Sequence, residues 1–328
     1  MIFLFGRNLS AFDPANSIRN CHSAGDQFWY TLRDTERKFE NQRYLILLDT
    51  TIDRSCEPVV NEDFERMIAC YESKSDPGNL FAGNYFIALY DKQTEQLNLF
   101  RDISGVMTGY YTNVNDCLIG GNEMHAVARL AEVTSFDELA LFQLLYTMYF
   151  VDGRTFYEQV NEVKCGGRLR FDSNGQLISE VYEPLKLATD ENGLAESENI
   201  ALLRERMTAT VQKHAGQNNV VMLSGGIDSV VLLLSLDELR PDCQLTAVSY
   251  LASGTRENET IYAKDIATHL KTELTIKEID PNDSSMYKRF EATVLKMNNP
   301  YYGVWIFGQL PALNVWRKWL RSSYRRIS

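Results

Sequence analysis

The feature that most constrains the fold is an apolar run that is broken by a short loop of small residues and then resumes. Residues 220–236 read VVMLSGGIDSVVLLLSL. VVML is wholly apolar, which is typical of a strand buried in a parallel sheet. SVVLLLSL predicts a helix, and the loop SGGIDS lies between the two at 224–229. A strand, a tight loop and a helix in this order indicate a parallel α/β fold.

The same alternation continues on both sides of this loop. Before it, Ile200, Leu203 and Val211 share one face of a predicted helix. Strands are predicted at 219–223, 244–250 and 273–279, and helices at 229–239 and 258–270. Strands and helices in strict alternation predict a doubly wound parallel sheet with helices on its faces.

The first 185 residues follow a different pattern, in which strands dominate. Strands are predicted at 44–51, 84–91, 97–102, 109–113 and 116–122, a helix at 136–150, and a hairpin with an Asn-Gly turn at 167–184. The segment 186–199 is polar, as linkers are. We therefore predict two domains, at 1–185 and 200–328, joined by a linker at 186–199.

Composition excludes several classes of protein. The 328 residues carry a net charge of −11, which argues against a general nucleic-acid binder, because phosphate contacts need clustered Lys and Arg. No apolar run reaches the roughly 18 residues of a membrane helix, and the start lacks a signal-peptide pattern. The six cysteines form no CxxC pair. We expect a cytoplasmic protein with reduced cysteines that binds neither nucleic acid nor membrane.

The loop itself predicts a nucleotide site. Glycines let a ligand approach the backbone, and the start of the helix offers unpaired N–H groups and a positive dipole end, so an anion is the expected guest. Ser224 and Ser229 add hydroxyl donors. Asp228 would repel a phosphate unless Mg²⁺ lay between them. The alternative is a plain strand-to-helix turn with Asp228 or Ser229 as the N-cap.

Several stretches resemble one family. The string Ser224-Gly225-Gly226-Ile227-Asp228-Ser229 resembles the pyrophosphate loop of the ATP pyrophosphatases, which cleave ATP between its α and β phosphates. Stretches similar to the asparagine synthetase family, glutamine-hydrolysing type, lie at 80–91, 99–111, 123–126, 155–175 and 259–267. The resemblance covers roughly residues 1–310.

The resemblance implies a fold and a set of site residues. It implies an α/β protein with two domains: an amino-terminal Ntn-type αββα glutaminase-like domain, and a doubly wound ATP-pyrophosphatase (PP-loop) domain. It assigns ATP and pyrophosphate binding to Ser224, Gly225, Gly226, Ile227, Asp228 and Ser229. Asp228 would hold Mg²⁺. Leu223, Ser249 and Leu251 would receive the adenine of ATP.

One departure from the family lies at the amino terminus. Glutamine-using members carry a cysteine nucleophile at position 2, where this chain has Ile2. We expect Ile2 to discourage removal of Met1, so that no free amine is placed beside position 2. The strand that carries the oxyanion-hole Asn-Gly pair in the family reads LLDTT at 47–51. We therefore expect a degenerate glutaminase-like domain that does not hydrolyse glutamine.

This departure is shared by β-lactam synthetases and lasso peptide cyclases. The resemblance to them implies that a small-molecule or peptide carboxylate becomes an acyl-adenylate and is attacked by an amine, in the second case to close a peptide macrocycle. Two alternatives remain open. One is an asparagine synthetase that uses free ammonia in asparagine biosynthesis, and the other is an inactive remnant that keeps ATP affinity.

The second departure lies near the carboxyl end. The family places an acidic loop after the next strand, whereas no acidic residue follows Glu291 here. We expect a carboxy-terminally truncated chain that binds ATP with poor turnover. Its basic tail would meet a second copy of the chain, in a homodimer, or a partner protein.

Overall fold

The computed structural model describes residues 1–7, 9, 21–33, 36–50, 59–80, 84–183, 193–239, 243–252, 258–280, 283–285 and 288. The chain divides into two compact units, 1–188 and 189–328, and each is described here by itself. The expected linker falls partly outside the described residues. Its last part differs from the expectation, because helix α5 (Glu196–His214) already begins there, with the Glu198 carboxylate accepting from the backbone N–H of Ala195 at 2.7 Å.

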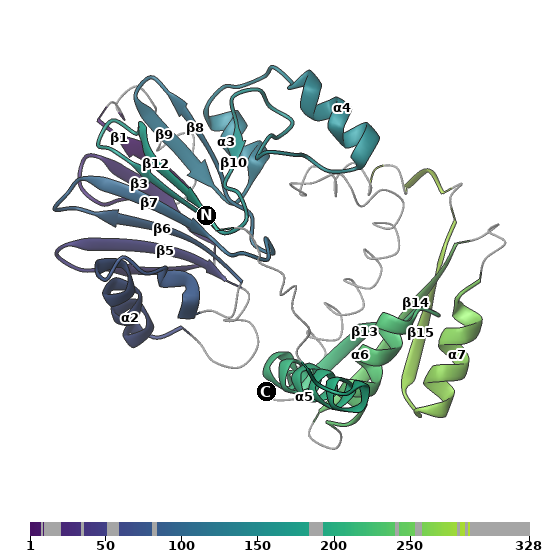
Figure 1. The fold of residues 1–328 in the computed structure, drawn as a ribbon. Coiled ribbons are helices and arrows are strands. Elements are labelled where there is room, and N and C mark those ends of the chain that lie inside the picture. Colours follow the sequence, from purple (N-terminus) through teal and green to yellow (C-terminus); the bar gives the residue numbers. More distant parts are fainter. Residues whose placement is uncertain are drawn as a thin grey trace, which may run out of the picture. The chain divides into compact units, whose positions relative to one another are not determined.

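Unit 1 is built on two antiparallel six-stranded sheets (Figure 1). The first has the order β10-β8-β9-β1-β3-β2. Its strands are β1 (Ile2–Gly6), β2 (His22–Ser23), β3 (Phe28–Thr31), β8 (Tyr110–Val114), β9 (Cys117–Gly121) and β10 (Asn161–Glu162). The second has the order β12-β11-β7-β6-β5-β4. Its strands are β4 (Arg37–Glu40), β5 (Tyr44–Thr50), β6 (Tyr85–Asp91), β7 (Gln96–Arg101), β11 (Gly167–Phe171) and β12 (Leu177–Tyr182).

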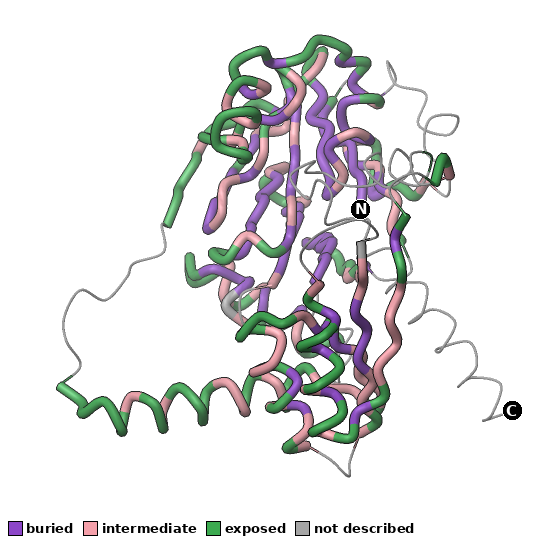
Figure 2. The backbone as a smooth tube through the Cα atoms, turned by 90° about the vertical axis from the view of Figure 1, so that its right-hand side faces the viewer, coloured by how far each residue is buried: buried purple, intermediate pink, exposed green. Residues whose placement is uncertain are grey.

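The period of two along the strands divides their side chains between the layers. Phe3 and Phe5 of β1 join Leu45 and Leu47 of β5 in one buried cluster between the sheets. The alternate residues of each strand point outward and pack against helices instead. Because β1 and β5 are buried on both faces, they read as largely apolar runs in the sequence. Figure 2 shows such buried stretches in purple.

The outward-facing side chains are covered by one helix on each sheet. On the first sheet, Ile2 and Leu4 pack in a cluster with Met124 and Val127 of α3 (Met124–Leu130). On the second, Ile46, Leu48 and their neighbours pack with Phe64 and Met67 of α2 (Asn61–Glu72), which the short helix η3 (Pro77–Leu80) follows. Unit 1 therefore has the four-layer αββα architecture that the sequence analysis expected.

Two local elements of unit 1 differ in detail from their predictions. Helix α4 (Glu138–Thr147) is shorter than predicted, since Asp137 caps its start by accepting from the N–H of Ala140 at 2.9 Å and Met148 ends it at φ +65°. The predicted hairpin joins β11 to β12. Gly175 has φ +72°, and its N–H donates to the carbonyl of Asp172 at 2.9 Å.

Unit 2 is a three-stranded parallel sheet with helices against it, as predicted. The strands are β13 (Asn218–Met222), β14 (Gln244–Ala252) and β15 (Glu273–Ile279), in that order. The helices are α5, α6 (Ile227–Asp237) and α7 (Thr260–His269). Val221, Leu233, Ala247 and Ala263 pack in one core. The predicted inner face of α5 is only partly correct, because Ile200 and Leu203 are exposed while Val211 packs against this core.

Candidate functional site

The SGGIDS stretch lies at the junction of β13 and α6, as expected, but the helix starts two residues before the predicted 229, so Ile227, Asp228 and Ser229 form its first turn. Leu223 ends the strand: its side chain is buried, and its N–H donates to the carbonyl of Val248 on β14 at 2.8 Å. Helix α6 begins at Ile227, with Gly226 as its N-cap and no side chain capping it. The loop thus occupies the carboxyl edge of a parallel sheet, where α/β proteins bind ligands.

The two serines of the loop hold its shape. The hydroxyls of Ser224 and Ser229 lie 3.0 Å apart, and the Ser229 hydroxyl also accepts from the N–H of Ser224 at 3.1 Å. The N–H of Gly226 donates to the Ser224 hydroxyl at 3.1 Å. These bonds close the loop on itself without a ligand, so the backbone is organised before an anion arrives.

The glycines of the loop provide close approach and do not require a left-handed backbone. Gly226 has an ordinary φ of −80°. A Cβ on Gly225 would lie 3.0 Å from the ring of Tyr262 on α7, and a Cβ on Gly226 would lie 3.2 Å from the Ser224 hydroxyl. Larger side chains at these positions would therefore fill the space over the start of the helix.

The exposed surface of the loop suits an anion. Gly225, Gly226, Ile227 and Asp228 are exposed, and the first N–H groups of α6 have no carbonyl partner within the helix. The positive end of the helix dipole is worth about 0.3–1 kcal/mol to a negative group there. The loop can therefore take a phosphate group without rearrangement of the helix.

Asp228 is not the N-cap, and neither is Ser229, because Gly226 holds that position. This overturns the alternative of a turn capped by either residue. Among the described residues, no group of three or more His, Cys, Asp or Glu side chains is placed to hold a metal ion. Asp228 supplies one carboxylate, which fits Mg²⁺, since this ion typically takes one or two protein carboxylates and completes its shell with phosphate oxygens and water.

The residues expected to receive adenine lie at the same sheet edge. Ser249 is buried in β14, next to Val248, whose carbonyl holds Leu223. Leu251 lies two residues further on, beyond the end of β13, and pairs with Glu278 of β15. The structure therefore brings Leu223 and Ser249 together beside the loop, with Leu251 one step further along the strand.

At the start of β1, unit 1 contains a buried polar network that the sequence analysis missed. The terminal ammonium of Met1 forms an ion pair with Glu36 and donates to Asn122 Oδ1 at 2.9 Å. Asn122 Nδ2 in turn donates to Glu36 Oε1 and to Asp49 Oδ2, both at 2.7 Å. Burial lowers the pKa of the Met1 amine, and the nearby Glu36 carboxylate opposes that shift. The amine in this network is that of Met1; the expectation that no free amine is placed at position 2 stays a prediction.

Position 2, where glutamine-using members of the family carry their nucleophile, is an isoleucine. Ile2 packs toward α3, and Cys117 pairs with Gly6 at the opposite end of β1. At about 3.4 Å per residue, five residues of strand separate Cys117 from Met1 by roughly 17 Å. Position 2 therefore offers no thiol, and Cys117 is too far along β1 to replace it.

A double antiparallel sheet between helices, followed by an α/β unit with an SGGIDS loop, is the organisation of ATP-dependent, amide-forming ligases. A glutamine amidotransferase domain model matches residues 55–183, and an asparagine synthase model matches residues 202–305. Together these matches span more than half of the chain. The chain belongs to the asparagine synthetase family.

Solved structures give weaker likenesses. The glutamine-dependent NAD+ synthetase from Acinetobacter baumannii, in complex with ADP, is 16% identical over 52% of this chain and 36% of that chain, with a TM-score of 0.23. The allosteric regulatory enzyme of purine biosynthesis is 10% identical over 84% of this chain and 74% of that chain, with a TM-score of 0.32. Both scores are too low to define the fold. No curated protein matches the chain.

Two further expectations can be compared with the described residues. None of the helices described is long and apolar enough to cross a membrane. The segment after Glu291, where the family's acidic loop was expected to be missing, lies outside the described residues, as does the basic tail.

Proposed function

We propose that this chain activates a carboxylate with ATP, as an acyl-adenylate, and converts it to an amide without hydrolysing glutamine. The observation that carries the proposal is the organised, exposed loop at 224–229, in a chain with Ile2 in place of the family's cysteine nucleophile. The substrate is a small-molecule or peptide carboxylate. In a peptide, an amine of the same molecule would close a macrocycle.

The proposed reaction has two steps. A substrate carboxylate oxygen attacks the α-phosphorus of ATP, and the bond from that phosphorus to the bridging oxygen breaks, so that pyrophosphate leaves with the electron pair. An amine nitrogen then attacks the acyl carbon and loses a proton, and AMP leaves. The chain binds and orients the reactants and stabilises the charge that develops on the leaving group.

Each predicted residue has a distinct part in the first step. The N–H groups of the loop and of the first turn of α6 receive the departing pyrophosphate, with Ser224 and Ser229 fixing their positions. Asp228 holds Mg²⁺, which when bound neutralises charge on the phosphate oxygens. Leu223, Ser249 and Leu251 bind the adenine of ATP.

ATP–pyrophosphate exchange tests the proposal, because it reports the first step alone. The full chain is incubated with ATP, Mg²⁺, labelled pyrophosphate and one carboxylate at a time: aspartate, and short peptides with an acidic side chain and a free amine. We expect label to enter ATP only when the correct carboxylate is present. Asp228→Asn should reduce exchange by at least about tenfold, the loss of one charged hydrogen-bonding or metal-binding group.

The matched control is Asp237→Asn. Asp237 lies on the same helix, nine residues on, or roughly 14 Å along its axis, at the end away from the loop. Exchange that is equally fast in wild type and Asp228→Asn would contradict the assignment of the loop. Exchange with aspartate alone, followed by asparagine formation from free ammonia, would favour the ammonia-using alternative. Tight ATP binding with no exchange for any carboxylate would favour the inactive remnant.

A further inference from the structure

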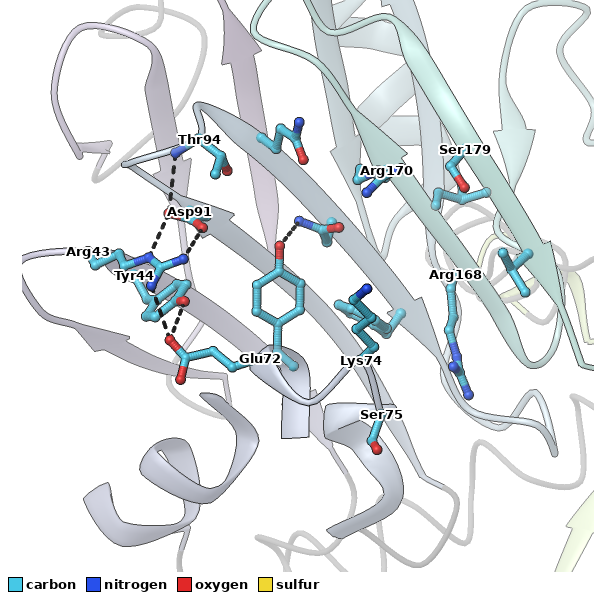
Figure 3. Close-up of a pocket in the computed structure, with 16 residues that line it drawn as sticks. Arg43, Tyr44, Glu72, Lys74, Ser75, Asp91, Thr94, Arg168, Arg170 and Ser179 are labelled. Atoms are coloured by element: carbon cyan, nitrogen blue, oxygen red, sulfur yellow. Dashed lines mark hydrogen bonds and ion pairs between the residues drawn. The ribbon is translucent and has the colours of Figure 1, made fainter. Parts of the chain in front are cut away.

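A groove in unit 1 lies outside everything described so far. It runs over the outer face of the second sheet, beside the carboxyl end of α2, and has a volume of about 730 Å³ (Figure 3). This volume is typical of small-molecule sites, which range from roughly 300 to 1,000 Å³. Residues from α2 and from β5, β6, β7, β11 and β12 line it, so pairing between distant segments creates the groove.

The strand register explains which side chains meet in the groove. Arg168 and Arg170 alternate with buried Leu169 and Phe171 on β11, so both arginines point to the outer face. Arg170 pairs with Asn98 of β7 on one side. On the other side it pairs with Ser179 of β12. A row of three polar side chains therefore crosses the sheet at Arg170.

Charge is distributed unevenly along the groove. At one end, Arg43 is neutralised, since it contacts both Asp91 oxygens at 3.2 and 3.0 Å and Glu72 at 3.1 Å. Arg168 has its own carboxylates, at 3.2 Å from Asp76 and 3.2 Å from Glu183.

Two further cations line the same groove. In the part of the chain that the structure describes, no carboxylate pairs with Lys74 or with Arg170. Lys74 and Arg170 are therefore cations of the groove that no carboxylate of the described residues neutralises.

Lys74 lies at a backbone position where glycine is favoured, so its long side chain needs another explanation. Helix α2 ends in a Schellman motif: the N–H of Lys74 donates to the carbonyl of Tyr71 at 2.9 Å, and the N–H of Ser75 donates to that of Cys70 at 2.8 Å. Lys74 takes the left-handed position of this motif, with φ +63°. Glycine is favoured there, so the chain keeps a long cationic side chain at a position that disfavours it.

Neutral hydrogen-bond donors line the same groove as Lys74 and Arg170. The Tyr71 hydroxyl accepts from Asn98 Nδ2 at 3.1 Å, which leaves its own proton available to a ligand. Burial raises the pKa of Tyr71, and the nearby Asp91 adds to this, so the phenol stays protonated at neutral pH. The hydroxyls of Ser75 and Ser179 enter from opposite sides of the groove (Figure 3). The ring of Tyr71 supplies an apolar surface, and it packs edge-on against Phe100, which is buried in the outer cluster.

We propose that this groove binds a small molecule carrying an oxyanion, a carboxylate or a phosphate, next to an aromatic or flat apolar group. Lys74 and Arg170 bind the oxyanion by charge-assisted hydrogen bonds, and the hydroxyls of Tyr71 and Ser179 donate to its remaining oxygens. The flat group lies against the ring of Tyr71. This site is independent of the proposed ATP loop, which lies in the other unit.

Calorimetric titration of the full chain tests the site with three probes: inorganic phosphate, N-acetyl-tyrosine, and N-acetyl-tyrosinamide, which keeps the ring but lacks the carboxylate. We expect wild type to bind at least one of the two anionic probes and, where N-acetyl-tyrosine binds, to bind the amide at least about tenfold more weakly. Binding of phosphate alone would identify a phosphate site. Binding of N-acetyl-tyrosine alone would identify a carboxylate site, and both results support the proposal.

Variants then locate the binding. Arg170→Glu and Lys74→Gly should each weaken the binding of the anion by about tenfold to a hundredfold, because each removes one charge-assisted contact. Lys74→Gly removes the side chain at a position that favours glycine, so this variant should fold. Arg66→Glu is the matched control, because Arg66 lies on α2 with only a 3.8 Å pair to Asp63 and does not line the groove.

Three results would overturn the proposal. The first is a wild-type protein that binds neither anionic probe. The second is that the Lys74→Gly and Arg170→Glu variants bind the anionic probe as strongly as wild type does. Phosphate binding that is lost in Gly226→Val but kept in Lys74→Gly would place the anion at the ATP loop, and would also overturn it.

Discussion

Asn122→Leu should destabilise unit 1 strongly, because Asn122 holds three charged groups in a buried network. Its side chain accepts from the Met1 ammonium at 2.9 Å and donates to Glu36 and Asp49 at 2.7 Å each. Leucine has a similar size but offers no hydrogen bond. The substitution therefore leaves charges in place while it removes the group that connects them.

The expected loss of stability follows from the charged groups that stay buried in the Asn122→Leu variant. A hydrogen bond to a charged group contributes about 1.5–3 kcal/mol, and breaking a buried charged network by removing one member typically costs about 3–5 kcal/mol. The three bonds share partners, so their values do not add. We expect a loss of about 3–5 kcal/mol, which is a large part of the 5–15 kcal/mol that a typical domain has.

Urea denaturation followed by circular dichroism, with the two units treated as separate transitions, measures this loss. Asn113→Leu is the matched control, since Asn113 lies on β8 and its side chain makes one bond to a neutral group, the carbonyl of Gly175 at 2.6 Å. We expect that control to lose only about 0.5–1.5 kcal/mol. An Asn122→Leu protein as stable as the control would refute the assignment of the network.

Three further predictions concern the two units. The purified chain should release no glutamate from glutamine, because Ile2 stands where a thiol is needed, and release that a thiol-alkylating reagent abolishes would contradict this. Gly226→Val should abolish nucleotide binding, measured by calorimetry, because its side chain would fill the space over the start of α6; binding at wild-type strength would make the loop a simple turn. Burial acts to raise the pKa of Asp91, but hydrogen bonds from Arg43 and backbone N–H groups hold it below the ordinary 3.8. The stability that this pair adds is therefore complete above pH 3.8 and is lost as the pH falls through the lower folded pKa, so the stability difference between wild type and Arg43→Gln should shrink in acid denaturation below pH 4.

Much of the fold could be predicted because local patterns specify it. The run VVMLSGGIDSVVLLLSL contains its own strand, loop and helix, and the structure has β13, the loop and α6 in that order. Helix α2 was missed although its signal was present. Phe64, Met67, Ile68 and Tyr71 recur at helical spacing, and all four contribute to the outer cluster of the second sheet.

The parts that sequence reasoning missed depend on pairing between distant segments. Glu36 and Asn122 are single polar residues, separated by 86 positions. They become neighbours only when the two sheets pack, because Glu36 precedes β4 of the second sheet and Asn122 follows β9 of the first. Arg170 meets Asn98 because β11 pairs with β7 across a long intervening segment. The alternation within a strand predicts which face a side chain occupies, but it does not predict the strand beside it.

The most direct test of the central claim is a calorimetric comparison of ATP binding with and without Mg²⁺. If Asp228 holds the metal against the phosphates of ATP, Asp228→Asn should weaken binding in the presence of Mg²⁺ by at least about tenfold, because it removes a charged oxygen ligand. In excess chelator, the variant should bind ATP at least as well as wild type, since the carboxylate then only repels the nucleotide. Asp237→Asn should match wild type in both conditions. Equal binding of Mg²⁺-ATP by wild type and Asp228→Asn would contradict the assignment of this loop as a nucleotide–metal site.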